Sequence, residues 1–255
     1  MSLGVAVPAG HTLVSSAERP DLDPAIRAMN AGIFEPFMLE DEVANRLWDR
    51  AYADWPEFQL ILLDPDGQVV AIGNSMPLAW DGTDDGLPAG WDDQVIRSVA
   101  DRDAGRAPDT LGAMLIVVRP ELRGGGFAAA ILAGFRAVAR ATGYRAVIAC
   151  VRPTDKERYP LTPIERYAGW TRPDGLPIDP WIRLHVRLGG RIVRPSPRSM
   201  TIRGSIADWE RWTGLTFPDD GDYIVKGGTA PVTIDHARDE GVYFDQNVWL
   251  VHELS

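Results

Sequence analysis

The residues with the clearest chemical potential in this sequence form a short glycine-rich segment near the middle of the chain, Arg123-Gly124-Gly125-Gly126. An apolar run at residues 113–118 precedes it, and an alanine-rich stretch that begins at Phe127 follows it. Glycines at the start of a helix leave backbone N–H groups bare, because no Cβ atoms shield them, and such groups bind phosphate or pyrophosphate. The segment therefore predicts a site for a phosphate-bearing ligand.

Three elements must position these glycines. The continuous apolar run at 113–118 is typical of a strand that is buried on both faces. The stretch after the glycines repeats apolar residues at helical spacing, namely Phe127, Ile131, Phe135 and Val138. Gly143 ends this helix, and a second apolar run at 145–151 follows directly. Strand, glycine turn, helix and strand together predict a βαβ unit with the glycines at the N-terminus of its helix.

Several kinds of protein place glycines at a helix start, and the neighbouring residues separate them. A P-loop requires Gly-Lys-Ser/Thr, and no lysine lies near these glycines. The dinucleotide fingerprint G-x-G-x-x-G/A is matched by Gly124, Gly126 and Ala129, but it requires the turn directly after the strand and an acidic residue after the next strand. Here residues 119–123 intervene, and Arg152 follows the second strand. A turn that only lets the helix pack closely on a sheet is the structural alternative to phosphate binding.

Residues 118–128 read Val-Arg-Pro-Glu-Leu-Arg-Gly-Gly-Gly-Phe-Ala and resemble motif A of the GCN5-related N-acetyltransferases. The signature of that motif is Arg/Gln-x-x-Gly-x-Gly/Ala, which Arg123, Gly126 and Ala128 fill. The resemblance implies acetyl-CoA as co-substrate, with its thioester hydrogen-bonded to the backbone at Val118. The residues implied to hold the pyrophosphate are Arg123, Gly124, Gly125, Gly126, Phe127 and Ala128.

The resemblance is specific over about residues 112–151, looser to 192, and elsewhere rests on the order of elements alone. It implies an α/β protein with a GNAT-like mixed, mostly antiparallel, twisted sheet flanked by helices. We expect the acyltransferase core at 1–200, with insertions at 80–110 and 152–179, and a C-terminal β-rich extension at 201–255 packed on it. The acidic insertion at 80–110 is either a lid over the acceptor or a solvated loop.

Transfer of an acetyl group from a thioester to an amine requires a proton for the departing thiolate. Relatives often supply it from a tyrosine on the helix after the second strand, four residues before the glycine that ends the helix. Residues 181–189 read Trp-Ile-Arg-Leu-His-Val-Arg-Leu-Gly, so that position holds His185. The resemblance implies His185 as the catalytic acid, because imidazole can also donate a proton. Tyr159 and Tyr167 are the substitutes.

The base that accepts the amine's proton is not evident, because the strand before the glycines contains no acidic residue. Glu35, or water relayed to a backbone carbonyl, are the candidates. Cys150 would be conceivable as an acyl-enzyme nucleophile. It lies in an apolar strand without a basic neighbour in sequence, so a place in the core is the favoured interpretation.

Composition restricts the function further. The net charge is −10, from 26 basic and 36 acidic residues, which argues against a nucleic-acid surface and is compatible with a cationic substrate. The four histidines are scattered, so no metal site is predicted. One cysteine excludes an internal disulfide, and neither a signal peptide nor an apolar run of membrane length is evident. We expect a cytoplasmic protein without a nucleic-acid or membrane partner, and the sequence leaves a homodimer open.

These observations together predict an N-acetyltransferase that acts on a small amine-bearing acceptor by direct transfer in a ternary complex. The alternative from another class is a catalytically silent acyl-CoA-binding or regulatory module with the same fold. The missing strand acid and the absent motif tyrosine favour this alternative, whereas the long aromatic insertions favour an enzyme.

Overall fold

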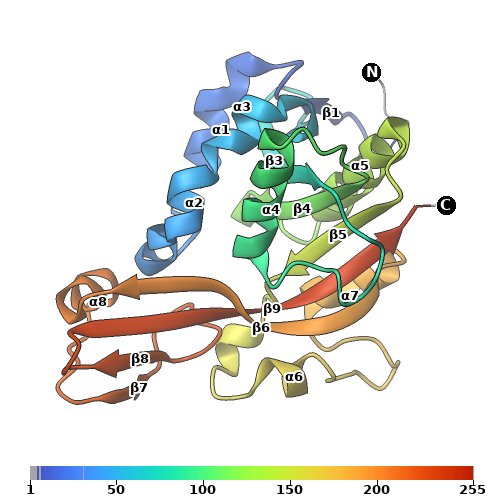
Figure 1. Ribbon diagram of the computed structural model, residues 1–255. Coiled ribbons are helices and arrows are strands. Elements are labelled where there is room, and N and C mark those ends of the chain that lie inside the picture. Colours follow the sequence, from blue (N-terminus) through green and yellow to red (C-terminus); the bar gives the residue numbers. More distant parts are fainter. Residues whose placement is uncertain (1–4, 6, 31, 255) are drawn as a thin grey trace.

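A single nine-stranded sheet runs through the molecule in the computed structural model, which describes residues 5, 7–30 and 32–254 (Figure 1). The strand order is β1-β2-β3-β4-β5-β9-β8-β7, and β6 also pairs with β9. The strands are β1 (Thr12–Ser15), β2 (Leu60–Leu63), β3 (Val69–Leu78), β4 (Thr110–Val118), β5 (Ala146–Val151), β6 (Arg191–Gly204), β7 (Gly221–Tyr223), β8 (Val232–Asp235) and β9 (Glu240–Glu253). Neighbouring strands are antiparallel except β4 and β5, so the predicted mixed, mostly antiparallel sheet is confirmed.

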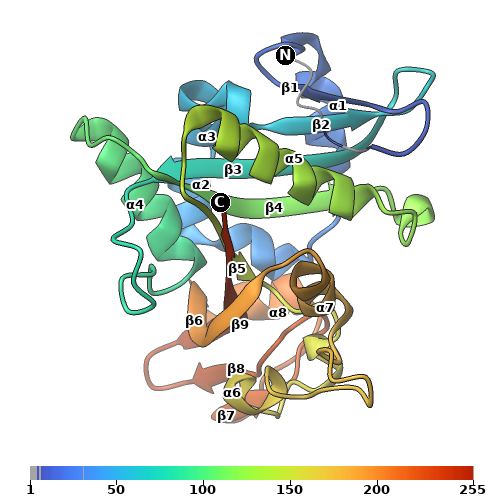
Figure 2. The ribbon, with the colours of Figure 1, turned by 90° about the vertical axis from the view of Figure 1, so that its right-hand side faces the viewer.

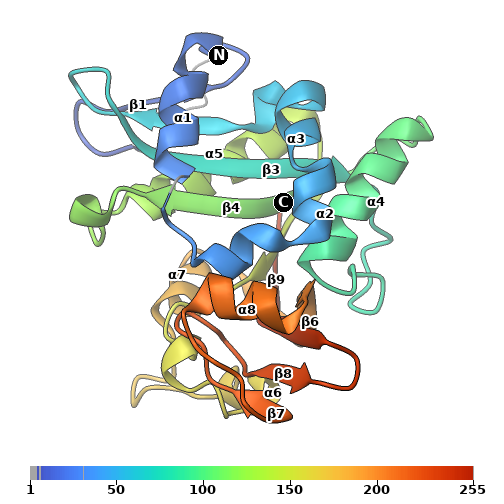
Figure 3. The same cartoon turned by 90° about the vertical axis from the view of Figure 1, so that its left-hand side faces the viewer.

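Helices cover both faces of this sheet. They are α1 (Asp23–Asn30), α2 (Glu42–Leu47), α3 (Asp49–Asp54), α4 (Trp91–Asp103), α5 (Phe127–Thr142), α6 (Ile164–Tyr167), α7 (Pro180–Arg187) and α8 (Ile206–Thr213). Helices α5 and α7 lie on the face seen in Figure 2, and α1, α2 and α3 lie on the opposite face seen in Figure 3. The sheet thus separates two sides of the molecule, here named the α5 face and the α2 face.

Close packing of α5 on the sheet depends on a small residue in β3. A Cβ atom at Gly73 would lie 2.3 Å from Ile131 Cγ2 and 2.7 Å from the ring of Phe135. Both of these helix residues are fully buried, as the helical spacing of apolar residues predicts. Helix α5 therefore sits directly against β3, and it also packs on β4 and β5, the strands that precede and follow it in the predicted βαβ unit.

The sheet splits between β4 and β5. These two strands pair only from Thr110–Ala113 to Ala146–Ala149, although β4 continues to Val118 and β5 to Val151. A bulge occurs where the pairing stops, because Asn74 of β3 faces Leu115 while Ser75 faces Ala113, so Met114 is the extra residue. Bulges bend the strand that carries them. The bend opens a gap between the C-terminal halves of β4 and β5.

Two segments that the sequence set apart contribute to this central structure. Helix α4, within residues 80–110, buries Trp91, Val95 and Val99 and is therefore part of the core. The interpretation of this segment as a lid or a solvated loop did not include a place in the core. Within residues 201–255, β9 pairs with β5 through its C-terminal half and with β8 through its N-terminal end. The expected boundary at residue 200 falls inside β6.

Candidate active site

The gap between β4 and β5 exposes backbone hydrogen-bonding groups of β4. The Arg119 N–H donates to the Val70 carbonyl of β3 at 3.0 Å. Successive residues of a strand direct their backbone groups to opposite sides, so Val118 and Ile116 direct theirs away from β3 and into the gap. The side chains of both residues are only partly buried. Val118 thus stands where an extended ligand in the gap would meet a backbone N–H, as the motif implies.

The glycine loop lies at the end of the same strand. Gly124 and Gly126 have φ angles of 84° and 83°, in the left-handed region that glycine adopts without strain. A Cβ atom at either position would have no neighbouring atom within 4 Å, so open space adjoins both. Gly126 is the N-cap of α5 and brings no side chain to the free N–H groups of the first turn, which begins at Phe127 and Ala128. The Arg123 side chain beside them is exposed.

The structure therefore brings all seven predicted cofactor-binding residues to one strand end and the loop that follows it. The fit to a coenzyme A pyrophosphate rests on the bare N–H groups, the adjoining open space and the exposed guanidinium of Arg123. Their roles in binding stay a prediction.

His185 lies away from this gap. Helix α7 begins as predicted, with Asp179 accepting hydrogen bonds from Trp181 N and Ile182 N at 2.9 and 3.0 Å. His185 is 1% exposed, and its Nδ1 lies 3.0 Å from Nε2 of His252. His252 faces Val147, in the part of β5 that still pairs with β4. His185 is thus beside the closed part of the sheet.

The environment of His185 also sets its charge. Burial, and then the neighbouring His252, lower the pKa of His185 to about 3, so its imidazole is neutral at neutral pH. Burial lowers the pKa of His252 to about 4 in the same way, with the nearby Arg136 contributing. A neutral imidazole is a much weaker acid than imidazolium. The role of His185 as proton donor stays a prediction that this placement does not favour.

The two substitute tyrosines lie near the start of α7. Tyr167 is buried, and its hydroxyl donates to Asp179 Oδ2 at 3.0 Å. Burial and the Asp179 carboxylate together raise the pKa of Tyr167. Tyr159 is 40% exposed and lies in ring contact with Tyr167 and Trp170. Of the three candidate acids, Tyr159 alone is accessible to solvent over much of its surface.

A pair of acids that the sequence interpretation missed lies on the α2 face. Asp41 caps α2 by accepting from Ala44 N at 2.7 Å, and Asp92 in the first turn of α4 accepts from Thr201 N at 3.0 Å. Helices α2 and α4 lie side by side (Figure 3), and the two carboxyl groups are close enough to influence each other's pKa. Asp41 Oδ2 and Asp92 Oδ1 are buried and have no hydrogen-bond donor in the described part of the chain.

Burial raises the pKa values of both acids of this pair. Asp41 is fully buried, and its burial raises the pKa of its carboxyl group. Burial and the adjacent Asp41 raise the pKa of Asp92 to about 8. Two buried carboxyl groups near one another cannot both ionise without strong repulsion, so a raised pKa is expected for at least one of them.

Contacts of the neighbouring Trp91 tie the acid pair to the gap. The Trp91 indole N–H donates to the carbonyl of Met114, the bulge residue of β4, at 3.0 Å. Its backbone N–H donates to Ser199 Oγ at 3.0 Å, and Ser199 Oγ lies 3.2 Å from Cys150 Sγ near the end of β5. The first turn of α4 therefore contacts β4 directly and is linked to β5 through Ser199 of β6, where the two strands separate. The acid pair borders the gap on the face opposite to α5.

A third buried acid stands close by with its charge already balanced. Asp245 of β9 accepts from Arg152 Nε at 3.0 Å, from Tyr243 Oη at 2.6 Å and from Thr229 Oγ1 at 2.9 Å. Arg152 directly follows β5, so this ion pair borders the same end of the gap. Asp245 adds to the negative potential that raises the pKa of Asp92.

The remaining candidates have ordinary structural partners. Cys150 is buried, and burial raises the pKa of its thiol to about 12, so a thiolate nucleophile is absent at neutral pH. Glu35 forms an ion pair with Lys226, with Oε1 2.7 Å from Nζ. Within residues 5, 7–30 and 32–254, no three His, Cys, Asp or Glu side chains are grouped as a metal site would require. No helix among them has the length and apolar character needed to cross a membrane.

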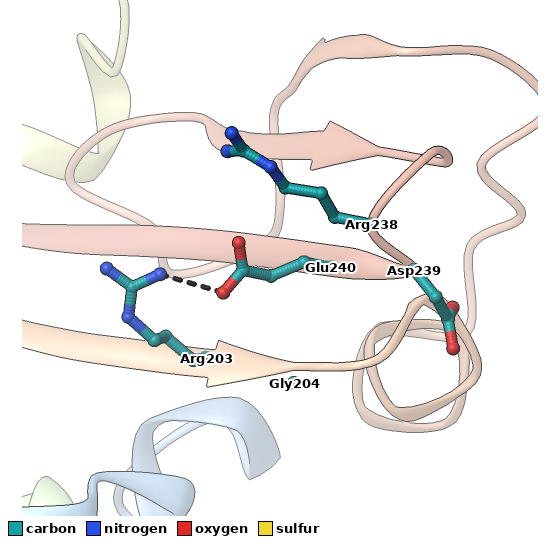
Figure 4. Close-up of a pocket in the computed structure, with 5 residues that line it drawn as sticks. All are labelled: Arg203, Gly204, Arg238, Asp239 and Glu240. Carbon is teal, nitrogen blue, oxygen red and sulfur yellow. Dashed lines mark hydrogen bonds and ion pairs between the residues drawn. The ribbon is translucent and has the colours of Figure 1, made fainter.

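A surface hollow lies far from the gap, at the opposite end of β6 and β9 (Figure 4). The residues that line it are Arg203, Gly204, Arg238, Asp239 and Glu240. Arg203 and Glu240 form an ion pair at 2.8 Å, so the charges within it largely compensate one another. This hollow does not contribute to a site at β4 and β5.

A sheet that splits between two parallel strands, with a glycine-started helix at the open end, defines the N-acetyltransferase class of fold. No protein-family model matches the sequence. The arginine N-acetyltransferase avaD of Aspergillus versicolor is 31% identical over an alignment of 287 positions. This alignment covers 99% of this chain and 97% of that protein. The chain belongs to the GCN5-related N-acetyltransferase (GNAT) superfamily and is an N-acetyltransferase with an acyl-CoA co-substrate.

Solved structures agree on the fold. The loading GNATL domain of CurA from Lyngbya majuscula matches with a TM-score of 0.61 at 15% identity, covering 96% of this chain and 98% of that one. The GphF GNAT-like decarboxylase in complex with isobutyryl-CoA matches with a TM-score of 0.59 at 18% identity, covering 96% and 100%. At these identities the likeness extends to the fold alone.

Proposed function

We propose that this protein acetylates the α-amino group of arginine, or of a closely similar cationic amino acid, by direct transfer from acetyl-CoA in a ternary complex. The observation that carries the proposal is the full-length similarity to an arginine N-acetyltransferase. The acidic character of the α2 face beside the gap, where Asp41 and Asp92 lie, supports a cationic acceptor.

The chemistry of arginine assigns different roles to its two basic groups. The guanidinium group keeps its charge at all physiological pH values, so it binds carboxylates well and is a poor nucleophile. The α-amino group loses its proton far more readily and can then attack a thioester. A site with carboxylates on one side of the gap would hold the guanidinium group and leave the α-amino group to react.

The donor side would use backbone groups, with the Arg123 side chain beside them. Bound acetyl-CoA supplies an activated thioester carbonyl. The Val118 N–H would polarise that carbonyl oxygen from the gap, and the N–H groups at Phe127 and Ala128 would hold the pyrophosphate together with Arg123. Because the loop lies on the α5 face and the acid pair on the α2 face, donor and acceptor would approach the gap from opposite sides. This arrangement leaves room for both at once and so supports the proposed ternary complex.

A coupled assay of thiol release from acetyl-CoA tests the acceptor. Arginine, homoarginine, lysine, agmatine and citrulline form the panel, and fragmentation mass spectrometry locates the acetyl group. We expect arginine to give the highest kcat/KM and a product acetylated on the α-nitrogen. Citrulline has a similar length and a neutral urea group, so it should react about 10- to 100-fold more slowly, as the loss of a charged hydrogen bond implies. An arginine rate equal to background hydrolysis would overturn the proposal.

A further inference from the structure

The chain that follows β5 enters surroundings with more positive than negative charge. Arg152 and Lys156 lie there beside one buried acid, Asp245, and Thr229 links the three, because its Oγ1 donates to Asp245 and its carbonyl accepts from Lys156 Nζ. Lys156 is fully buried, and its ammonium group donates only to backbone carbonyls. Burial lowers the pKa of this group to about 8, so it still carries its charge at neutral pH. Asp245 already balances Arg152, which leaves one positive charge of this cluster without an ion-pair partner in the described part of the chain.

The guanidinium group of Arg152 is held along one edge and open along another. Its Nε donates to the two carboxylate oxygens of Asp245 at 3.0 and 3.1 Å, and its Nη2 donates to the Gly227 carbonyl. These contacts fix the plane of the group. Nη1 donates to no acceptor among the described residues, yet it is not one of the buried atoms that lack a partner, and 30% of the side chain is exposed. The Nη1 edge therefore faces solvent, where a ligand has room to meet it.

Arg152 stands at the open end of the gap, on the α2 face. Pairing between β4 and β5 ends at Ala149, three residues before Arg152. Alternate residues of an extended chain share a face, so Arg152 lies on the face of Cys150, which contacts Ser199 and through it the start of α4. A molecule that enters the gap from the α2 face thus meets Arg152 where β5 has already left β4.

The chemistry of this cluster suits a carboxylate. Buried charges in proteins are normally paired, because leaving water is costly for them, so a surplus cation favours an anionic ligand. A guanidinium edge matches the two oxygens of a carboxylate in a bidentate pair. An amino acid carries its carboxylate on the same carbon atom as its α-amino group. A carboxylate held at Arg152 would therefore keep the α-amino group beside the gap.

We propose that Arg152 selects acceptors with a free α-carboxylate, which its open edge binds, and that this contact sets the α-amino group at the gap. The inference rests on the proposed function, because it requires an amino acid as acceptor. Asp245 would be a positioning residue that orients the guanidinium group and leaves its Nη1 edge to the substrate. The bound carboxylate would balance the positive charge that Lys156 adds to the cluster.

Steady-state acetylation of L-arginine and agmatine by the full-length protein tests this inference. Agmatine is arginine without its carboxylate, and each acceptor is compared with itself between wild type and variant, so the different pKa values of the two amines cancel. Arg152→Lys keeps a cation for Asp245 and removes the planar fork. We expect kcat/KM for arginine to fall about 10- to 100-fold, mainly through KM. For agmatine, kcat/KM should stay unchanged.

Two further variants guard against a general effect on the structure. Arg50→Lys is the matched control, because Arg50 on α3 is 34% exposed and is likewise held by carboxylates, those of Asp54 and Asp103. It should alter the kcat/KM of neither acceptor. Arg152→Gln combined with Asp245→Asn removes both charges of the ion pair together, so no buried charge loses its partner. This double variant should reproduce the selective loss for arginine, and it carries the comparison if Arg152→Lys does not fold.

The outcomes separate this inference from the proposed function. If the wild type acetylates arginine and the Arg152 variants slow arginine and agmatine equally, or slow neither, the inference is overturned and the function stands. Selective loss for another cationic amino acid, with arginine unreactive in the wild type, supports the carboxylate site and overturns arginine as the acceptor. A wild type that acetylates agmatine and no amino acid overturns both.

Discussion

The individual residues of the proposed site offer opposite kinds of group to the two substrates. The donor side offers backbone N–H groups at a glycine turn, and the acceptor side offers buried carboxyl groups. Bare N–H groups suit the phosphates of coenzyme A, and carboxylates suit a cationic amino acid. In the proposed function, each substrate would be recognised by charge of the opposite sign, and neither side would attract the other's ligand.

The two glycines at the ends of α5 allow a matched test of the donor site. Gly126 and Gly143 have the same φ angle of 83°, and a Cβ atom at either would have no neighbour within 4 Å. Replacement of either by alanine should therefore cost a similar free energy of unfolding, about 1–2 kcal/mol, through left-handed strain. Gly126→Ala alone should also lower acetyl-CoA affinity, by about tenfold or more, because its methyl group points into the proposed pyrophosphate space. Calorimetry and urea unfolding measure both quantities, and equal acetyl-CoA affinity in the two variants would contradict the assignment.

Among the secondary-structure elements, α4 has the most consequence for the site. It carries Asp92, and through Trp91 it holds the carbonyl of the bulge residue Met114. The bulge is where β4 turns away from β5, so α4 supports the opening of the gap from the α2 face. A shift of this helix would move Asp92 and the backbone of β4 together.

Replacement of Trp91 by phenylalanine tests this coupling. Phe keeps an aromatic ring against Trp48 and removes the indole N–H, which leaves the Met114 carbonyl without its donor. The expected cost is about 1–3 kcal/mol of stability, together with a fall in kcat/KM for arginine. Trp80→Phe is the control, because the buried Trp80 indole donates to the Thr83 carbonyl in a loop. A comparable loss of stability in both variants with unchanged arginine kcat/KM in Trp91→Phe would show that the bulge does not depend on α4.

The elements differ in how far the sequence could predict them. The βαβ unit around Gly126 was predictable because a buried strand, a glycine turn and an amphipathic helix are all encoded in neighbouring residues. The start of α7 at Asp179 was predictable for the same reason, since a cap followed by proline is a local signal. Its register placed His185 correctly on the helix, but the partner His252 lies on β9 and could not be inferred from local pattern.

The acid pair was not predictable, for a reason that concerns helix starts in general. Asp41 and Asp92 each stand at the beginning of a helix, where acidic residues are common because they cap N–H groups and complement the helix dipole. Nothing in either local sequence distinguishes them from ordinary capping residues. Only the packing of α2 against α4 brings the two carboxyl groups close together. Such sites arise from tertiary structure and require coordinates to be found.

At the scale of the whole molecule, buried ionisable groups on the two faces make stability depend on pH. On the α5 face, His185 and His252 pack together between α7 and β9 with pKa values lowered to about 3 and about 4. On the α2 face, the acid pair has raised pKa values. Histidines with lowered pKa values weaken the folded state as pH falls, and carboxyl groups with raised pKa values weaken it as pH rises.

Acid unfolding isolates the histidine pair. In the unfolded chain, imidazole takes up a proton below about pH 6.5, whereas the folded protein keeps both rings neutral until the pH approaches their lowered pKa values. The stability contributed by the neutral rings is thus complete above pH 6.5 and is lost as pH falls toward 4, by up to about 1.4 kcal/mol per pH unit for each histidine. Urea unfolding at pH 7.5, 6 and 5 should show this loss in the wild type.

Removal of one ring should reduce that slope. His185→Gln retains a polar side chain that can hydrogen-bond to His252, and it does not titrate, so its stability should fall less steeply between pH 7.5 and 5 than that of the wild type. The control is His11→Gln, which changes a histidine near Phe127 at the other end of α5 and should follow the wild-type curve. If His185→Gln follows the wild-type curve as well, the ring is not held neutral by burial. An imidazolium would then be available at His185, and its predicted role as proton donor to the thiolate would regain support.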